Sequence, residues 1–311
     1  MANTISGFYQ TVVAAATEAS QALVYNLKAV DSVYLDYRSE AATIGQALNV
    51  IIPGVRTGNV QDQGTGDVNL TDVSETTVSI VFNKHPSDAF VIRDFEQYNS
   101  PALLRKLFLD SAIKGVKENI NAAVCSLFTT GNFTTLSAIS GTSHDITTSQ
   151  FLSGMAFLAD QRVPIQNDPE NVSLLVPSTV YTGMLADNNW TQAQIAGMFT
   201  AETVRRTGEF PTAFGATIKL DQQMPTTGAV GSRTFTCAYL HRWAVAVATR
   251  PLPAPDDKVV DYSYVDFMGI PIRITLGYNQ YPKQGYILTV DAGYGLKVVR
   301  DNMCQLFSVS E

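Results

Sequence analysis

The chain has 311 residues, of which 45% are hydrophobic and 16% charged, with a net charge of −7 at pH 7 and a pI near 5.0. This much apolar material can build the core of one large domain or two ordinary domains, which excludes disorder throughout. The net negative charge and the lack of a Lys and Arg cluster in the sequence argue against a protein whose main function is to bind the phosphate backbone of a nucleic acid.

Residues 1–44 are predicted to form an arm. A mildly amphipathic helix through Phe8, Val12 and Ala16 leads into extended VYLDYRSE. The first cation is Lys28, so the segment lacks the basic start of a secretory signal, and no apolar run in the chain reaches the roughly 20 residues that cross a bilayer. We therefore expect a soluble chain without a membrane partner, whose arm can pack on another subunit.

Residues 45–85 combine two strands, GQALNVIIP and TTVSIVFN, with a long polar loop between them. In each strand apolar residues occupy alternate positions, namely Leu48, Val50, Ile52, Val78, Ile80 and Phe82. The loop is rich in Gly, Asp, Asn and Thr and has almost no apolar side chain to pack on a core. Because a connection of this length in a compact domain usually marks function, we predict a hairpin that projects from the body and contacts other molecules.

A long helix is predicted over residues 100–130. Asn99 or Ser100 can cap it, Pro101 suits its first turn and Gly131 suits its end. Apolar residues at three- and four-residue spacing form one stripe that includes Leu103, Leu104, Leu107, Phe108, Ile113, Val116, Ile120, Ala123, Val124, Leu127 and Phe128. The opposite face carries charges of alternating sign at Lys106, Asp110, Lys114 and Glu118, which predicts a solvated ladder of weak ion pairs rather than a nucleic-acid site.

A polar segment around residue 145 marks a candidate domain boundary. Helical spacing resumes over 148–163, followed by a short buried strand, VSLLVP, and a helix, STVYTGMLAD. The remaining pieces are bounded by Gly, Pro or Asp as strands are, and they read AFGATIKL, RTFTCAYL, WAVAVATR, DYSYVDF and GIPIRITLGY. The sequence therefore predicts an α+β fold with a strand-rich final third.

A search for catalytic, cofactor-binding or metal-binding residues yields none. His85, His144 and His241 lie far apart in the sequence, and Cys125, Cys237 and Cys304 have no metal or redox spacing, which favours buried thiols in a reducing compartment. QGTGDV at 63–68 lacks the P-loop Lys, and the pair Asp256 and Asp257 lies in a proline-rich segment. Trp190 and Trp243 fit core or interface packing, because no basic residues interleave with them.

The order of these elements resembles the major capsid proteins of tailed bacteriophages. Local phrases that are similar include FLSGMAFLADQRVP, NVSLLVPSTVYTGMLAD, FMGIPIRITLGY and the closing GYGLKVVRDN. The resemblance implies a tailed-phage major capsid fold with an N-terminal arm (1–44), an extended hairpin loop (45–85), a peripheral domain (86–145 and 258–311, with the spine helix at 100–130) and an axial domain (146–257).

By the same resemblance the chain is expected to be a capsid subunit and not an enzyme. It would be made in the host cytoplasm and assemble with itself into the hexamers and pentamers of an icosahedral virion shell. A scaffolding protein, a portal and a surface cement protein are implied partners, and packaged DNA would meet the shell only by weak, non-specific contact. Because the candidate arm begins within a few residues of Met1, scaffolding is expected from a separate protein or from a segment removed by processing. Lys84 is better interpreted as an ordinary surface lysine than as a crosslinking residue.

Two alternatives remain open. The first is an encapsulin-type compartment shell, which shares the fold but encloses a cargo enzyme, and the second is a soluble α/β enzyme. The long loop favours either shell over the enzyme, because a projecting hairpin has unpaired strand edges that invite association.

Overall fold

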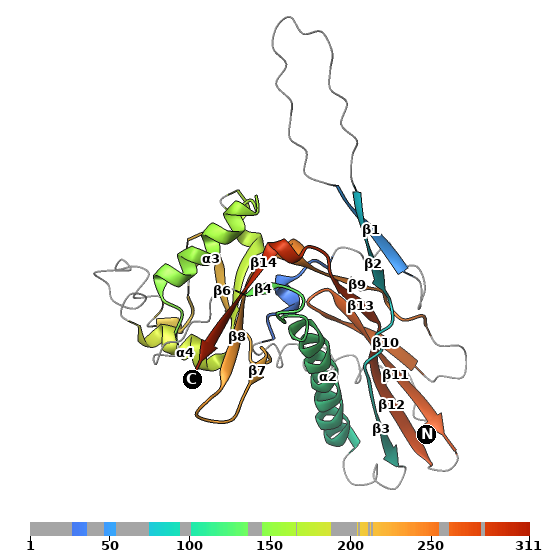
Figure 1. Cartoon of the computed structure of the whole chain (residues 1–311). Coiled ribbons are helices and arrows are strands. Elements are labelled where there is room, and N and C mark those ends of the chain that lie inside the picture. Colours follow the sequence, from blue (N-terminus) through green and yellow to red (C-terminus); the bar gives the residue numbers. More distant parts are fainter. Residues whose placement is uncertain are drawn as a thin grey trace, which may run out of the picture.

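The computed structural model describes residues 27–35, 47–53, 75–93, 101–135, 145–165, 167–187, 204, 206–210, 212, 214–254, 261–280 and 284–311. The predicted helix near residues 8–22, the polar loop after residue 53 and the segment containing Asp256 and Asp257 therefore lie outside the described residues. In Figure 1 two large sheets stand on either side of a long helix, and a strand pair extends away from both.

The first large sheet has six strands and carries two helices beside it (Figure 1). Its path is β4 (Thr134–Thr135), β14 (Cys304–Ser310), β8 (Thr234–His241), β5 (Val172–Val176) and β6 (Thr217–Leu220), with β7 (Thr226–Thr227) also pairing with β8. The helices are α3 (Thr148–Asp160) and α4 (Ser178–Ala186). Phe151 of α3 meets Tyr239 of β8 edge to face, with 5.2 Å between ring centroids, so α3 packs directly on this sheet.

The second large sheet has four antiparallel strands with one buried face. Its order is β10 (Asp261–Phe267), β11 (Ile270–Asn279), β12 (Gly285–Ala292) and β3 (Ser87–Arg93). Along β11 the residues Ile270, Ile272, Ile274 and Leu276 are buried, and those between them are partly exposed. Because side chains alternate across a strand, this sheet turns one apolar face inward, and the long helix packs against it at β3 and β12.

The long helix, α2 (Pro101–Cys125), starts where the sequence predicts but stops earlier. It ends at Cys125 rather than near Gly131, because the chain tightens there: the Leu127 and Phe128 amides donate to carbonyls three residues back, at 3.1 Å each. This turn directs Phe128 into the core, where its ring lies 6.1 Å from that of Phe133. The prediction of a helix through residue 130 was therefore wrong by about one turn at its C-terminal end.

In the predicted stripe of α2, Ile113, Val116, Ile120 and Val124 are buried and Ala123 is partly buried. Leu109 and Ala112, which the predicted stripe did not include, are also buried. On the open side Lys114 and Glu118 form the expected ion pair, with 3.6 Å between Nζ and Oε1. Two polar residues were missed as core members. Lys117 is buried with its ammonium 5.3 Å from the centre of the Phe267 ring, and Asn121 is fully buried.

The helix α3 ends at Asp160 rather than at residue 163. Arg162 adopts a left-handed backbone with φ of 63°, its amide donates to the Ala159 carbonyl, and the Val163 amide donates to the Leu158 carbonyl. These two hydrogen bonds are those of a Schellman termination, with Arg162 at the position that usually favours glycine. The spacing of apolar residues does not reveal this turn.

Two shorter sheets join the large ones. One is the hairpin of β1 (Ala47–Pro53) and β2 (Glu75–Val81), and the other pairs β13 (Tyr294–Val298) with β9 (Val245–Thr249). The piece WAVAVATR begins as a short 3-10 helix, Arg242–Ala244, before β9. The piece AFGATIKL forms a strand only over Thr217–Leu220, since Phe214 and Gly215 have positive φ.

Residues 27–35, which the sequence assigned to the arm, are part of the core. Five of their apolar side chains are buried, namely Leu27, Ala29, Val30, Val33 and Leu35. Tyr34 joins the free edge of β9, since its amide donates to Val245 and its carbonyl accepts from Val247. This part of residues 1–44 is thus a strap that crosses the body of the molecule.

The domain boundaries proposed from the sequence stay a prediction. One large cluster of buried residues runs through α2 and both large sheets, so the core is continuous between them. In addition, β14 pairs with β8 from Cys304↔Leu240 to Ser310↔Thr234, although the predicted boundaries assign residues 258–311 to the peripheral domain.

Candidate functional site

The predicted hairpin is present, and its two strands pair so that their predicted apolar residues lie opposite one another. Val50 lies opposite Val78 and Leu48 opposite Ile80 in an antiparallel ladder that ends at Pro53↔Glu75. Leu48, Val50 and Ile52 are partly buried, while Ile51 on the other face is 60% exposed. Figure 1 shows the paired ends of β1 and β2 at the upper side of the molecule, away from both large sheets.

The base of the hairpin is held against β13 by a close approach of two backbones. The Lys84 amide donates to the Tyr294 carbonyl at 2.9 Å, and the Tyr294 amide donates back at 3.0 Å. A Cβ on Gly295 would lie 2.3 Å from the Val81 carbonyl oxygen, and one on Gly293 would lie 2.7 Å from the Phe82 ring. The GYG phrase at 293–295 therefore has a physical reason, because only glycine permits this contact.

A small apolar cluster fastens the inner face of the hairpin to β9. Ile80, Ala246 and Ala248 are buried together, and Leu48 and Val50 pack against them. Beside this cluster lies a half-open cleft of about 160 Å³ lined by Tyr34, Val50, Ile51, Ile52, Trp243, Ala246, Val299 and Arg300. Trp243 is 46% exposed and its ring meets His241 edge to face, so it forms a wall of the cleft instead of a core contact.

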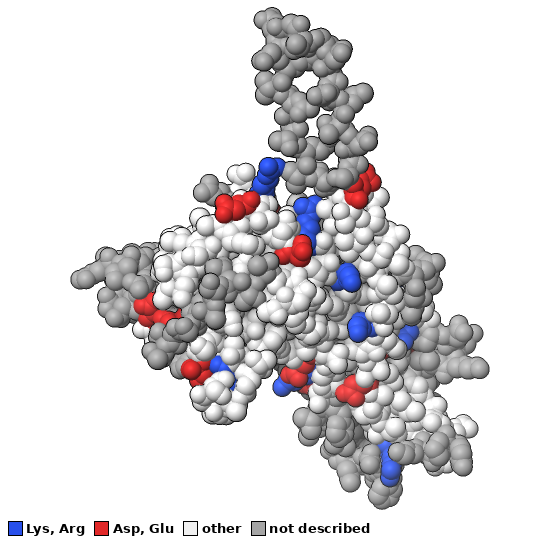
Figure 2. Space-filling view, viewed as in Figure 1, with Lys and Arg blue, Asp and Glu red and all other residues white. Residues whose placement is uncertain are grey.

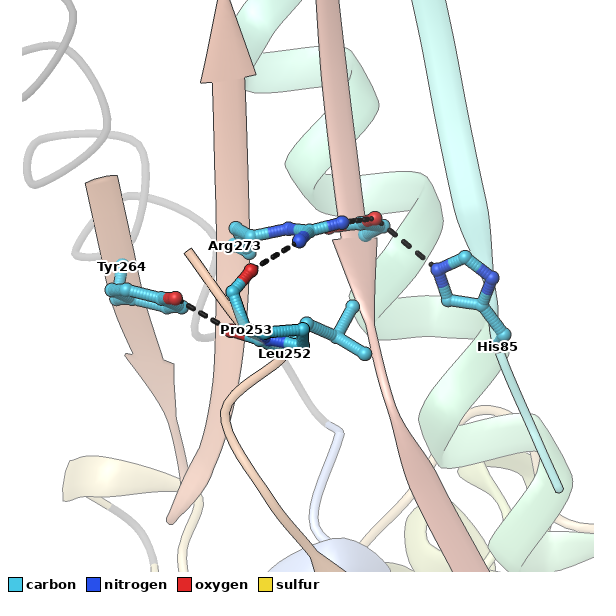
Figure 3. Close-up of polar contacts among 6 residues, drawn as sticks. His85, Leu252, Pro253, Tyr264 and Arg273 are labelled. Carbon is cyan, nitrogen blue, oxygen red and sulfur yellow. Dashed lines mark hydrogen bonds and ion pairs between the residues drawn. The ribbon is translucent and has the colours of Figure 1, made fainter. Parts of the chain in front are cut away.

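A polar cluster centred on Arg273 and Asp291 lies on the outer face of the four-stranded sheet (Figure 3). Arg273 of β11 is directly opposite Asp291 of β12 and donates to both its carboxylate oxygens, from Nε at 2.9 Å and from Nη2 at 2.6 Å. The remaining Nη1 donates to the Pro253 carbonyl at 2.6 Å. These hydrogen bonds to Asp291 raise the pKa of the Arg273 guanidinium.

Two further side chains complete this cluster. Tyr264 donates its hydroxyl to the Leu252 carbonyl, and His85 lies with Nε2 3.2 Å from a carboxylate oxygen of Asp291. Asp291 is almost fully buried, with 4% of its side chain exposed, whereas that of His85 is 56% exposed. The sequence search did not find Arg273 and Asp291, because their pairing depends on the β11–β12 register and β12 had not been recognised.

His241 is fully buried, and the histidine search did not predict this. Its Nδ1 accepts from the Trp243 amide at 3.3 Å, and its Nε2 faces the Asp168 carboxylate at 3.6 Å. Burial lowers the pKa of the imidazole, while Asp168 acts in the opposite direction. This arrangement fastens the loop before β5 to the end of β8.

The other candidate residues do not gather into a site. Cys125, Cys237 and Cys304 are free and buried, and burial raises the pKa of each thiol well above its ordinary value. Lys84 has an exposed side chain. His144, Trp190 and the glycine-bearing loop at 63–68 lie outside the described residues. Within the described ranges, no group of three His, Cys, Asp or Glu side chains could hold a metal ion.

The surface charge follows the mixed, acidic composition. In Figure 2 the Lys and Arg side chains are separate from one another and interspersed with Asp and Glu, and no basic patch forms among the described residues of that face. Of the helices that the structure describes, none is both long and apolar enough to cross a membrane.

The large sheets, the central helix and the projecting strand pair together form the fold predicted from the resemblance to tailed-phage capsids. No protein-family model matches the chain, and no curated protein sequence matches it. Solved structures, however, match nearly its whole length. A structure of Mycobacterium phage Che8 shares 16% identity and a TM-score of 0.62 over 90% of each chain.

Two other structures have the same fold. The capsid of cyanophage P-SCSP1u shares 12% identity, with a TM-score of 0.63 over 89% of this chain and 86% of that chain. A virus-like particle from Pyrococcus furiosus shares 9% identity, with a TM-score of 0.53 over 96% of this chain and 99% of that chain. These likenesses show the fold, and they confirm the resemblance and the α+β fold class predicted from the sequence.

Proposed function

We propose that this protein is the major capsid protein of a tailed bacteriophage and assembles with itself into the icosahedral shell that encloses the viral genome. The observation that carries the proposal is the β1–β2 hairpin, which projects from a body whose fold matches capsid structures along nearly the whole chain. A strand pair of this kind leaves backbone groups and Ile51 open to a neighbouring copy. The proposed location is the virion, after synthesis in the host cytoplasm.

The test is assembly of the purified chain. We expect sedimentation and electron microscopy to reveal hexamers, pentamers or closed shells at high protein concentration, with or without a separately supplied scaffolding protein. A chain that stays monomeric under all of these conditions and turns over a small substrate would contradict the proposal.

We also propose that the subunit consists of two parts that occupy different positions in a capsomer. The four-stranded sheet with α2 forms a peripheral part, corresponding to residues 86–145 and most of 258–303, and the six-stranded sheet with α3 and α4 forms an axial part around the capsomer axis. The pairing of β14 with β8 supports adding residues 304–311 to the axial part. Mass spectrometry of crosslinked capsomers would test this division, because contacts around one axis should join axial parts of neighbouring copies.

A second candidate is a compartment shell that encloses a cargo enzyme. It is favoured by the likeness to the virus-like particle from Pyrococcus furiosus, which extends over 96% of this chain. The two candidates differ in what the shell contains. Particles isolated from the native source should hold packaged DNA if the protein is a capsid subunit, and a protein cargo without DNA if it is a compartment.

The remaining partners follow from the capsid proposal. A portal, a scaffolding protein and a surface cement protein are its proposed companions, and the role is structural rather than enzymatic. With a net charge of −7 and dispersed cations, the subunit should contact DNA only weakly and without sequence preference. Tight, strongly salt-dependent binding of free subunits to duplex DNA would contradict this expectation.

A further inference from the structure

Three covalent crossings join the hairpin and the β9–β13 pair to the four-stranded sheet. Residues 82–86 connect β2 to β3, the segment after β9 leads toward β10, and Gly293 connects β12 to β13. The direction of the hairpin relative to this sheet depends on how these crossings are held. Helix α2 packs on the inner face of the sheet, so it does not touch the outer face, where the crossings meet.

Two of the crossings make polar contacts with the Arg273–Asp291 pair (Figure 3), and the third begins two residues after Asp291. Arg273 donates to the Pro253 carbonyl in the segment after β9. His85 in the β2–β3 connection contacts Asp291, and the amide of the adjacent Ala292 donates to the Pro86 carbonyl at 3.1 Å. Asp291 itself lies two residues before Gly293, at the third crossing.

The pair is built to hold these segments firmly. The planar guanidinium uses two nitrogens on one carboxylate and a third on a main-chain carbonyl, so its orientation is fixed by three hydrogen bonds. Because the Asp291 carboxylate is almost completely removed from water, loss of Arg273 would take both guanidinium hydrogen bonds from a buried negative charge, and the neighbouring His85 is itself exposed. Water would then enter the point where the crossings meet.

We infer that Arg273 and Asp291 form a positioning device that sets the direction in which the β1–β2 hairpin leaves the four-stranded sheet. Breaking the pair leaves both sheets folded, because their apolar faces and the backbone hydrogen bonds between their strands do not depend on these two side chains, but it frees the crossings to move. The hairpin then samples several directions instead of one. The consequence for shell assembly rests on the proposed function, whereas the effect on hairpin direction does not.

The first measurement uses unassembled subunits. Spin labels are attached at Thr77→Cys on β2 and Ser111→Cys on α2, both exposed positions, and the three native cysteines are buried and unreactive. In Arg273→Met we expect the distance distribution between the labels to broaden roughly twofold, while circular dichroism retains the wild-type spectrum and a cooperative melt. A distribution as narrow as that of the wild type would overturn the inference.

Two further variants keep the test decisive. Lys114→Met removes the partner of Glu118 in an exposed ion pair on α2 and should leave the distribution unchanged. Arg273→Lys keeps the charge beside Asp291 but loses the fork that also reaches Pro253, and it should give an intermediate width even if Arg273→Met fails to fold. If Arg273→Lys folds and keeps the narrow wild-type distribution, the device is absent.

Assembly is then measured with the same proteins without labels. We expect Arg273→Met to form about tenfold fewer closed shells than the wild type, and Lys114→Met to form as many as the wild type. If Arg273→Met broadens the label distance and still closes shells normally, the link from hairpin direction to assembly is refuted. If the wild type forms no shells, the proposed function fails while the label distances still decide the positioning role.

Discussion

At the scale of single residues, Asp221 shows how a buried carboxylate can organise a junction. It is fully buried and accepts hydrogen bonds from the amides of Lys28 and Ala29, at 2.7 and 2.8 Å, and from the Asn121 side chain at 2.9 Å. The Gln223 amide also donates to it. These donors come from the strap at residues 27–35, from α2 and from the turn after β6, so one side chain connects three elements.

Replacing this carboxylate by an amide should destabilise the fold. In Asp221→Asn one acceptor oxygen becomes an NH₂ group that faces the N–H donors around it, so at least one buried donor loses its partner. We expect a loss of about 2–4 kcal/mol in the free energy of unfolding, measured with urea, and faster hydrogen exchange at Lys28 and Ala29. Asp31→Asn is the matched control, since Asp31 pairs with Lys219 near the surface and should change stability by less than about 1 kcal/mol. Equal losses in the two variants would show that the Asp221 network has no special role.

His241 should make stability depend on pH. Burial lowers the pKa of its imidazole in the folded state, so the unfolded chain binds a proton more readily. The stabilising contribution is therefore present above the unfolded pKa of about 6.5 and is lost as pH falls below it. We expect the stability advantage of the wild type over His241→Gln to shrink between pH 7.5 and pH 5.5, measured by urea unfolding at each pH. Carboxylates common to both proteins cancel in this difference, and parallel pH curves would contradict the assignment.

At the scale of elements, the contact between β2 and β13 depends on glycine. In Gly295→Ala the new methyl group would overlap the Val81 carbonyl, and backbone atoms cannot rotate away as a flexible side chain can. We expect Gly295→Ala to lower the melting temperature by several degrees and to loosen the hairpin base, which hydrogen exchange at Lys84 and Tyr294 would report. Gly277→Ala on β11 is the control, because an added Cβ there meets no atom within 4 Å. A similar melting temperature for both variants would disprove the close-approach explanation.

Strict alternation and long helical stripes were the sequence signals that predicted elements best. The two hairpin strands and α2 were predicted correctly because the apolar residues of each element recur at a regular spacing along its length. In each element these residues lie on one face, which packs against other apolar residues. β3, β12 and β14 were missed. β14 begins with a continuous run of buried residues, and β12 has four buried residues among its last five, so neither alternates like a half-exposed strand.

For a related reason, the sequence predicted the hairpin of the candidate site but not the Arg273–Asp291 cluster. The hairpin is a local feature of sequence, since its two strands frame one loop. The Arg273–Asp291 cluster is not local: His85 and Asp291 are 206 residues apart, and the carbonyls of Leu252 and Pro253 leave no side-chain signal. Likewise, the spacing of apolar residues in 27–35 does not predict the hydrogen bond from the Ala29 amide to Asp221, which is 192 residues away in the sequence. Such contacts depend on which strands pair and in which order, and the pattern of a single sequence does not reveal this pairing.

At the scale of the whole molecule, folding and assembly should be separable. The core that stabilises the subunit is made by the two large sheets, α2, α3 and the strap, and the hairpin contributes Ile80 and Phe82 from its base. The polar segment between Pro53 and Glu75 adds sequence with little apolar content. The proposed assembly, by contrast, requires surfaces open to a neighbouring copy, and among the described elements β1 with its exposed Ile51 is the candidate for such a surface.

Shortening the hairpin should therefore abolish assembly while leaving the subunit folded. Replacing residues 54–74 by Asn-Gly joins the paired ends Pro53 and Glu75 through a two-residue turn that suits antiparallel strands. We expect the wild-type circular dichroism spectrum and a melting temperature within a few degrees of the wild type, but no closed shells by sedimentation or electron microscopy. Val116→Asp supplies the opposite phenotype, because it buries a carboxylate on the apolar stripe of α2 at a cost of several kcal/mol and should unfold the subunit. A shortened protein that melts as low as Val116→Asp, or that still closes shells, would refute an intersubunit role for the hairpin.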